Sequence, residues 1–360
     1  MSSWRLAEYP KGAAAARAAS GRPDSTCQQA LPLVAQIFVD VARMCADFVQ
    51  VKETWSAADD AQSEALGSTY DRHMTLTRFG FHFSSMSYEG VDERGLFQQI
   101  ADTAMAAEAA GFDSIWVPDH VHQNPIGGGP SGPMPEAYTL LSALAMKTEH
   151  VLLGSLVTPV TFRHPALLAK VVATLDVVSG GRAVLGVGAA WDVEEHAAYG
   201  FDFPGVAERE DRLEEMVIVC RELLTSSPAS YDGVYNRLED AWNSPRPIQA
   251  RIPILVGGGG ERRTLATAAK YGDACNFFGD PEVVRHKFEV LGEHCERIGR
   301  DVSEIAKTCA IFSPESEHEL LDQVAQRLAA GADGVILFGR GCPSPETLTA
   351  WGAALHRAFD

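Results

Sequence analysis

The stretch from residue 151 to residue 188 shows two kinds of hydrophobic periodicity in succession. Residues 151–157 form an apolar run bounded by turn residues, which is typical of a buried strand. Across residues 165–178 the apolar positions recur at the spacing of one helix face, and a second apolar run follows at 183–187. Strand, helix and strand within about forty residues form a βαβ unit, whose strands run parallel.

The same alternation continues along the chain from Thr77 to the C-terminus. It predicts eight strands, each followed by a helix, at residues 77–83, 114–117, 151–157, 183–187, 254–256, 274–277, 308–312 and 334–337. Between the fourth and fifth strands, Asp232 and Gly233 predict a hairpin. A single (β/α)₈ TIM barrel, an α/β fold, explains this regularity best. A doubly wound open sheet is the alternative, but no GxGxxG follows the first strand.

Polar residues collect where the strands of the 151–188 unit end. The carboxyl ends of the strands are the edge at which barrels of this kind bind ligands. The polar residues at or just beyond the two strands are Ser155, Thr158, Arg163, His164, Trp191 and Asp192.

Composition excludes several classes of function. The formal net charge of −18 argues against nucleic-acid binding, which needs clustered Lys and Arg. No apolar run approaches the roughly 20 residues of a membrane span. The seven cysteines form no CxxC pair and no disulfide pattern, so we expect a cytoplasmic protein that acts on a small molecule.

Residues 1–73 do not share the strand–helix alternation. Their first part is rich in Ala, Gly and Ser and is typical of disorder, while residues 31–55 are compatible with a loose amphipathic helix. We expect an N-terminal extension over 1–73 and the barrel domain over 74–360, with Met74 as the natural start.

Two segments of the central unit resemble a known family. SLVTPVTFRHPALLAK at 155–170 and GGRAVLGVGAAWD at 180–192 are similar to the bacterial luciferase-like superfamily, and within it to F420-dependent oxidoreductases. The resemblance extends from about Thr77 to the C-terminus. It implies hydride transfer between coenzyme F420 and an unidentified small organic substrate. The alternative is an FMN-dependent monooxygenase that uses reduced flavin and oxygen. We expect a homodimer in either case.

Asp119 and His120 end the second strand and are the candidate catalytic residues. A histidine at this edge can donate or accept a proton. In the F420-dependent relatives an Asp-His pair at this point lies beside the deazaflavin ring, which implies the same role here. The alternative is a structural His that orders the loop through Asp119. Some sugar-oxidising relatives have Trp four residues after the His, where this chain has Asn124, so a sugar-phosphate substrate is in doubt.

His120, Val121 and His122 also form an HxH sequence, which ends a strand in many metal-dependent barrel hydrolases. His82, one strand earlier, is a possible third ligand. Zinc needs three or four converging ligands, but the later strand ends offer no complementary His, and the last strand, at 334–337, ends without the Asp that such hydrolases use. We therefore predict no metal site.

The segment from Ser155 to Pro159 matches the part of the family that passes beneath the flavin. By resemblance Ser155, Leu156 and Thr158 contact the cofactor, with a cis peptide bond between Ser155 and Leu156. The alternative is an ordinary strand end in which Thr158 caps the next helix.

Gly188 and Ala189 end the fourth strand, where small residues let a planar ring or a phosphate approach the backbone. Many relatives have Gly at the position of Ala190, and the sugar-phosphate dehydrogenases have Glu at the position of Trp191. The next polar residues, Glu194, Glu195 and His196, are predicted to form a solvated helix face.

The run Gly257, Gly258, Gly259 and Gly260 after the fifth strand is the best candidate phosphate site. Consecutive glycines leave backbone N–H groups open, and the following helix adds partial positive charge. Arg262, or its neighbour Arg263, is placed to reach the acidic tail of coenzyme F420. A merely flexible turn is the alternative.

Overall fold

Eight parallel strands form a closed barrel in the computed structural model, which describes residues 77–360 except 313 and 340. Hydrogen bonding runs round the barrel in chain order and closes where the last strand pairs with the first. The strands are β1 (Phe79–His82), β2 (Ser114–Val117), β3 (Leu152–Ser155), β5 (Ala183–Gly188), β8 (Ile254–Gly257), β9 (Ala274–Phe278), β10 (Ala306–Phe312) and β11 (Gly334–Phe338). Every residue of β1, β2, β5 and β11 is buried, which explains their unbroken apolar runs.

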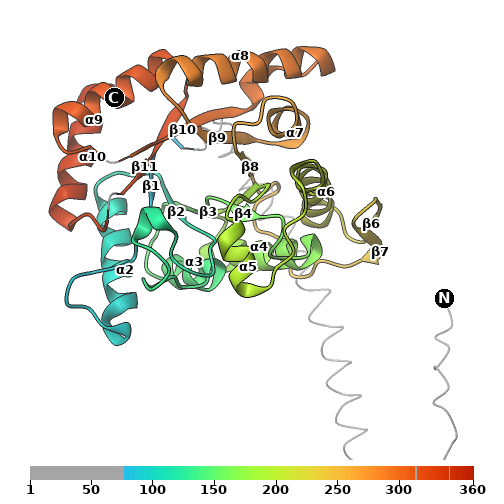
Figure 1. Cartoon of the computed structure of the whole chain (residues 1–360), viewed down its shortest axis with the longest axis horizontal. Coiled ribbons are helices and arrows are strands. Elements are labelled where there is room, and N and C mark those ends of the chain that lie inside the picture. The colour runs from blue at the N-terminus through green and yellow to red at the C-terminus, as the bar shows by residue number, and fades with distance from the viewer. Residues whose placement is uncertain (1–76, 313, 340) are drawn as a thin grey trace, which may run out of the picture. The chain divides into compact units, whose positions relative to one another are not determined.

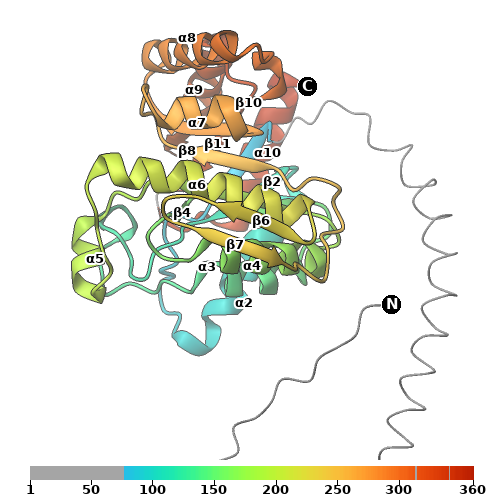
Figure 2. The same cartoon turned by 90° about the vertical axis from the view of Figure 1, so that its right-hand side faces the viewer.

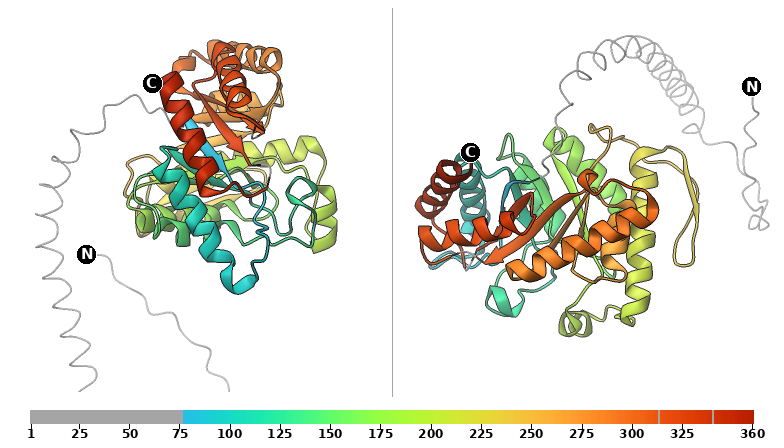
Figure 3. Two further views of the ribbon diagram at one scale, coloured as in Figure 1. Left: turned by 90° about the vertical axis from the view of Figure 1, so that its left-hand side faces the viewer. Right: turned by 90° about the horizontal axis from the view of Figure 1, so that it is seen from above.

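Helices surround these strands (Figures 1, 2 and 3). They are α2 (Glu93–Ala109), α3 (Ala137–Ala145), α4 (Pro165–Ser179), α5 (Val193–Tyr199), α6 (Val206–Thr225), α7 (Thr264–Tyr271), α8 (Pro281–Ile298), α9 (Glu317–Ala329) and α10 (Pro345–Phe359), with short 3₁₀ turns η1 (Pro125–Gly127) and η2 (Val302–Glu304). None of these helices combines the length and the apolar composition that a membrane crossing requires.

The predicted eight strands and the hairpin are confirmed. The hairpin consists of β6 (Ala229–Asp232) and β7 (Arg237–Ala241), which pair antiparallel and contact α6 (Figure 2). The apolar periodicity predicts helices over 211–224 and 261–271, and both begin at other residues in the structure. Helix α6 begins five residues early, at Val206, because Gly205 provides no side-chain cap that would signal a start. Helix α7 begins only at Thr264, because residues 261–263 form a turn.

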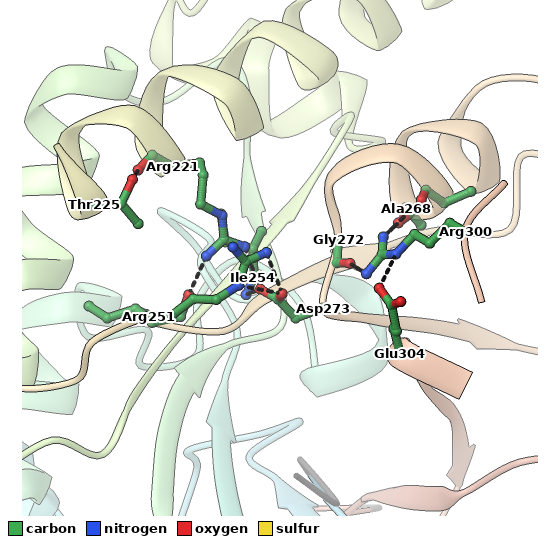
Figure 4. Close-up of polar contacts among 11 residues, drawn as sticks. Arg221, Thr225, Arg251, Ile254, Ala268, Gly272, Asp273, Arg300 and Glu304 are labelled. Carbon is green, nitrogen blue, oxygen red and sulfur yellow. Dashed lines mark hydrogen bonds and ion pairs between the residues drawn. The ribbon is translucent and has the colours of Figure 1, made fainter. Parts of the chain in front are cut away.

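Asp273 ties strands together at the amino-terminal end of the barrel (Figure 4). It precedes β9, and its Oδ2 accepts a 2.8 Å hydrogen bond from the backbone N–H of Ile254, the first residue of β8. Arg221 of α6 and Arg251 contact the same carboxylate, the latter at 2.8 Å. Groups at this end of a barrel serve stability, whereas ligands bind at the opposite end.

We predict that a chain lacking residues 1–73 folds and binds cofactor like the full-length protein. The barrel closes with residues 77–360 alone, and the expected extension lies outside the described residues. Circular dichroism, thermal unfolding and cofactor titration on both chains test this. Insolubility of the shorter chain, or a loss of its cofactor affinity, would refute the prediction.

Candidate active site

A cavity of about 600 Å³ opens at the carboxyl ends of the strands. Residues from β1, β5, β8, β9 and β11, and from the segments that follow β2, β3, β5 and β8, line it. The lining includes His82, Asp119, His120, Asn124, Leu156, Val157, Gly188, Ala189, Trp191, Glu195, Glu210, the run Gly257–Gly260, Asn276, Phe278 and Phe338. The cavity wall therefore combines histidines, carboxylates and aromatic rings with a run of glycines.

His120 is held by Glu195. Its Nδ1–H donates to Glu195 Oε2 at 2.8 Å, and the backbone N–H of Val121 donates to the other carboxylate oxygen at 2.6 Å. Burial acts to raise the pKa of Glu195, but the hydrogen bonds from His120, Val121 and His122 outweigh it and lower the pKa. The ionised carboxylate therefore fixes the tautomer of His120 that leaves its Nε2 as the free ring nitrogen.

The predicted solvated face is confirmed for Glu194 and wrong for Glu195 and His196. Both side chains are 1% exposed, because the loop after β2 bonds to Glu195 and the rings of Phe162 and Phe203 pack against His196. His196 Nδ1 donates to the Asp192 carbonyl oxygen at 2.6 Å, and its Nε2 lies 2.6 Å from Thr161 Oγ1. The sequence held one sign that Glu195 has a local partner. Asp192 caps α5 three residues before Glu195, which is the spacing of a capping box.

Asp119 bonds to residues other than His120. Its carboxylate forms a two-point ion pair with Arg163, whose Nη2 lies 3.1 Å from Oδ1, and it accepts a 2.8 Å hydrogen bond from Thr158 Oγ1. Burial raises the pKa of Asp119, and the Arg163 guanidinium opposes that shift. Asp119 thus fixes the β3–α4 connection behind the cavity. The sequence left open that His120 is a structural residue bonded to Asp119. The carboxylate that bonds to His120 is Glu195 instead.

His82 is a further histidine of the cavity wall. Its ring stacks on Phe338, with centroids 3.9 Å apart and planes 17° apart, and its Nδ1 lies 3.2 Å from Ser84 Oγ. The buried Nε2 has no hydrogen-bond partner among the described residues. Burial, followed by the nearby His120, lowers the pKa of His82 to about 3. This ring is therefore neutral in the folded protein at ordinary pH.

We predict that His82 makes the protein less stable in mild acid. In the unfolded chain its pKa returns to about 6.5, so between pH 6.5 and 3 the unfolded state binds the extra proton. At pH 5, which lies about 1.5 pH units below the pKa of the unfolded state, this proton binding lowers the free energy of unfolding by about 2 kcal/mol. The loss in unfolding free energy from pH 7 to pH 5 should be smaller by that amount in His82→Gln. Equal losses in the two proteins would contradict the assignment.

The predicted cis peptide bond is present but one residue later, between Leu156 and Val157. The prediction of Ser155–Leu156 is wrong because hydrogen bonding to β2 extends one residue beyond β3, where the Leu156 N–H donates to the Val117 carbonyl oxygen at 2.9 Å. Thr158 starts the short strand β4 (Thr158–Pro159), and it is His164, not Thr158, that caps α4. Leu156 lines the cavity, whereas Ser155 and Thr158 are buried behind it.

Gly188 and Gly257 leave room for Val157. A β-carbon on either glycine would lie 2.6 Å from a methyl group of Val157, too close for any real contact. The next residues, Ala189 and Ala190, turn their carbonyl oxygens toward Arg209 Nη1 at 2.8 and 2.5 Å. Ala190 has a φ of 66°, in the left-handed region that favours glycine.

The glycine loop, Gly257–Gly260, has two open amides. The Gly258 N–H donates to the Asn276 carbonyl oxygen at 2.8 Å, whereas no described residue accepts a hydrogen bond from the N–H of Gly259 or Gly260. Gly258 has a φ of 120°, which an L-residue rarely adopts. Helix α7 follows, so its amino-terminal dipole adds to the open amides. This arrangement can bind an anion.

The two arginines after the glycine loop differ in their surroundings. Arg263 is committed to Asp211 of α6 and to the Ala207 carbonyl oxygen. Arg262 is exposed, does not line the cavity, and makes no hydrogen bond or ion pair with the described residues. Arg262 is therefore the available cation of the pair, at the rim and outside the cavity.

The family model described as luciferase-like monooxygenase matches residues 74–334. The chain belongs to this family. Among curated relatives it is 33% identical to an F420-dependent glucose-6-phosphate dehydrogenase of Microbacterium testaceum over 249 residues, which cover 68% of this chain and 70% of the relative. The same enzyme of Amycolatopsis mediterranei is 33% identical over 227 residues, covering 62% and 67%.

Solved structures of this luciferase-like fold superpose on most of the chain. An F420-dependent secondary alcohol dehydrogenase in complex with an F420-acetone adduct has a TM-score of 0.68 at 20% identity, covering 79% of this chain and 99% of that one. The monooxygenase RslO1 of Streptomyces bottropensis has a TM-score of 0.65 at 20% identity, covering 78% and 98%. At such identities the likeness establishes the barrel fold and not the reaction.

Asn124 and Trp191 are the two side chains for which the resemblance implies a difference from sugar-phosphate dehydrogenases. Asn124 uses its side-chain oxygen to accept a 3.0 Å hydrogen bond from the Gly127 N–H, which caps η1. Trp191 is 60% exposed and packs edge-on against His120, with centroids 5.6 Å apart. An indole thus stands beside His120.

The HxH sequence does not bring its histidines together. His122 stacks on Tyr199, with centroids 5.9 Å apart, while its Nδ1 donates to the Gln123 carbonyl oxygen. A different set has donor atoms within 4.8 Å of one another, namely His120, Asp192 and Glu195. Hydrogen bonds within the protein already occupy these carboxylates, so they serve to position His120.

Proposed function

We propose that this protein is an F420-dependent oxidoreductase that transfers a hydride between coenzyme F420 and a small organic substrate. The observation that carries the proposal is a cavity whose wall combines a histidine oriented by a buried carboxylate with a glycine loop that has two open amides. The F420-dependent relatives support the choice of cofactor. Fold alone would not distinguish it from FMN.

The residues of the cavity fit a phosphate-bearing, planar cofactor. The open amides of Gly259 and Gly260 would hold the phosphate. Leu156 and Val157 offer an apolar surface to a ring system. Neither Gly188 nor Ala189 has a side chain large enough to obstruct that ring system. In this proposal Ser155 and Thr158, which are buried behind the cavity wall, shape the β3–β4 segment.

The deazaflavin ring would accept or donate the hydride when bound. His120 handles the proton that accompanies it. When an alcohol is oxidised, its C–H bond yields the hydride with both electrons, and its O–H proton goes to His120 Nε2. Glu195 stabilises the resulting imidazolium, and the cavity wall around Trp191 and Phe338 limits the access of water.

Turnover tests this proposal against the monooxygenase alternative. Reduced F420 should be oxidised without oxygen when ketones or aldehydes are supplied, and deuterium at the reactive carbon of the cofactor should appear in the product alcohol. A monooxygenase would instead consume oxygen and reduced FMN. Oxygen-dependent product formation, with no transfer of deuterium, would refute the proposal.

We further expect the enzyme to be a homodimer that needs no nucleic acid or membrane. Light scattering on the purified protein should give a mass of about twice the 38.8 kDa chain.

A further inference from the structure

The glycine loop lies between two helices that present opposite charges to it. On the α6 side, a β-carbon on Gly260 would lie 3.6 Å from Glu210 Oε1. The other carboxylate oxygen of Glu210 is buried and has no hydrogen-bond partner among the described residues. On the α8 side, a β-carbon on Gly259 would lie 3.3 Å from Cε of Lys287. A negatively charged group leaving the loop is therefore repelled by α6 and attracted by α8.

Basic side chains of α8 converge on the residues that follow the loop. Lys287 Nζ donates to the Gly259 carbonyl oxygen at 2.6 Å and lies 2.9 Å from Glu261 Oε1. His286 Nε2 lies 3.3 Å from the same carboxylate oxygen, and His294 Nε2 donates to the Glu261 carbonyl oxygen at 2.7 Å. These three side chains, His286, Lys287 and His294, form the basic cluster together with the exposed Arg262.

Glu261 is the carboxylate that the basic cluster surrounds. Its side chain is 44% exposed and contacts Lys287 and His286 at once. These hydrogen bonds and charges lower its pKa. A carboxylate from a ligand would meet the same donors if Glu261 turned away, since one side of Glu261 is open to solvent. Glu261 thus marks a position at which a carboxylate is stabilised.

We propose that the basic cluster binds the acidic tail of coenzyme F420, and that Glu261 occupies the place of a tail carboxylate until the cofactor arrives. The tail is a chain of carboxylates attached beyond the phosphate. A phosphate held in the glycine loop would bring the tail to the cluster at high effective concentration, so individually weak surface contacts add to the affinity. This inference rests on the proposed function, which supplies the cofactor.

The test compares two forms of the cofactor on full-length protein. One is F420 with a tail of several glutamates, and the other is the same compound without glutamates. We expect the tailed form to bind about tenfold more tightly at low salt, since each exposed ion pair contributes up to roughly a fivefold effect. That advantage should shrink at high salt. The double variant Lys287→Met, Arg262→Met should abolish it, and Glu261→Gln should increase it about threefold.

Arg297→Met is the matched control, because it removes a cation from the last turn of α8, where the side chain donates to the Glu293 carbonyl oxygen. It should leave the tail advantage unchanged. Equal binding of both forms to the wild-type protein would overturn the proposal. So would a double variant that weakens both forms equally, which would mean that Lys287 only shapes the loop. If neither form binds, the F420 assignment itself fails, and the two failures are distinguishable.

Discussion

His120→Asn is expected to slow the chemical step by ~10²–10⁴ while leaving cofactor affinity unchanged. The substitution removes the ring nitrogen that faces the substrate, Nε2, but keeps a side chain that can donate to Glu195 Oε2. The glycine loop follows β8, on a different part of the barrel rim, so the phosphate site is unaffected. Single-turnover kinetics with pre-reduced F420, beside equilibrium titration, measures both quantities.

Glu195→Gln is the companion variant, because it keeps the shape of the side chain and removes its charge. It should reduce the rate less than His120→Asn, and the double variant should be no slower than His120→Asn alone, since the two residues act as one unit. If His120 were only a structural residue, His120→Asn would lower the unfolding temperature and preserve the rate per folded molecule. A folded His120→Asn protein that turns over at the parental rate would refute the catalytic role.

Gly258→Asp is expected to weaken cofactor binding at least a hundredfold. The substitution places a carboxylate beside the open amides of Gly259 and Gly260, where the phosphate is proposed to bind, and its charge opposes the negative ligand. Cofactor fluorescence titration gives the affinity, and thermal unfolding gives the stability of the same sample.

Gly258→Ala separates charge from backbone strain. Both variants force a side chain onto a residue whose φ is 120°, which costs about 1–3 kcal/mol of stability in each. The alanine variant should therefore lose as much stability as the aspartate variant but much less affinity. If both variants are folded and bind the cofactor like the parent, the phosphate lies elsewhere.

The barrel could be predicted from the sequence because its strands are buried on both faces. Continuous apolar runs such as 183–187 mark such strands without ambiguity once helices with regular periodicity separate them. The glycine loop was recognisable for a similar reason, since its chemistry lies in the backbone of consecutive residues. Local signals of this kind do not depend on how distant segments meet.

The partners of His120, the proposed catalytic histidine, could not be predicted in this way. Glu195 lies 75 residues from His120, and its neighbours Glu194 and His196 made it resemble a solvated helix face. Asp119, adjacent to His120 in sequence, bonds to Arg163 instead, 44 residues away. A charged side chain pairs according to which loops cross above the barrel, and that depends on tertiary packing rather than on periodicity.

Direct titration of the purified protein with coenzyme F420 and, separately, with FMN tests the central claim most directly. The two ligands share a planar ring system and a phosphate, so both can reach the glycine loop, and the measurement reports which one the cavity selects. This account predicts that F420 binds at least tenfold more tightly than FMN. Tighter binding of FMN would contradict it and favour the monooxygenase.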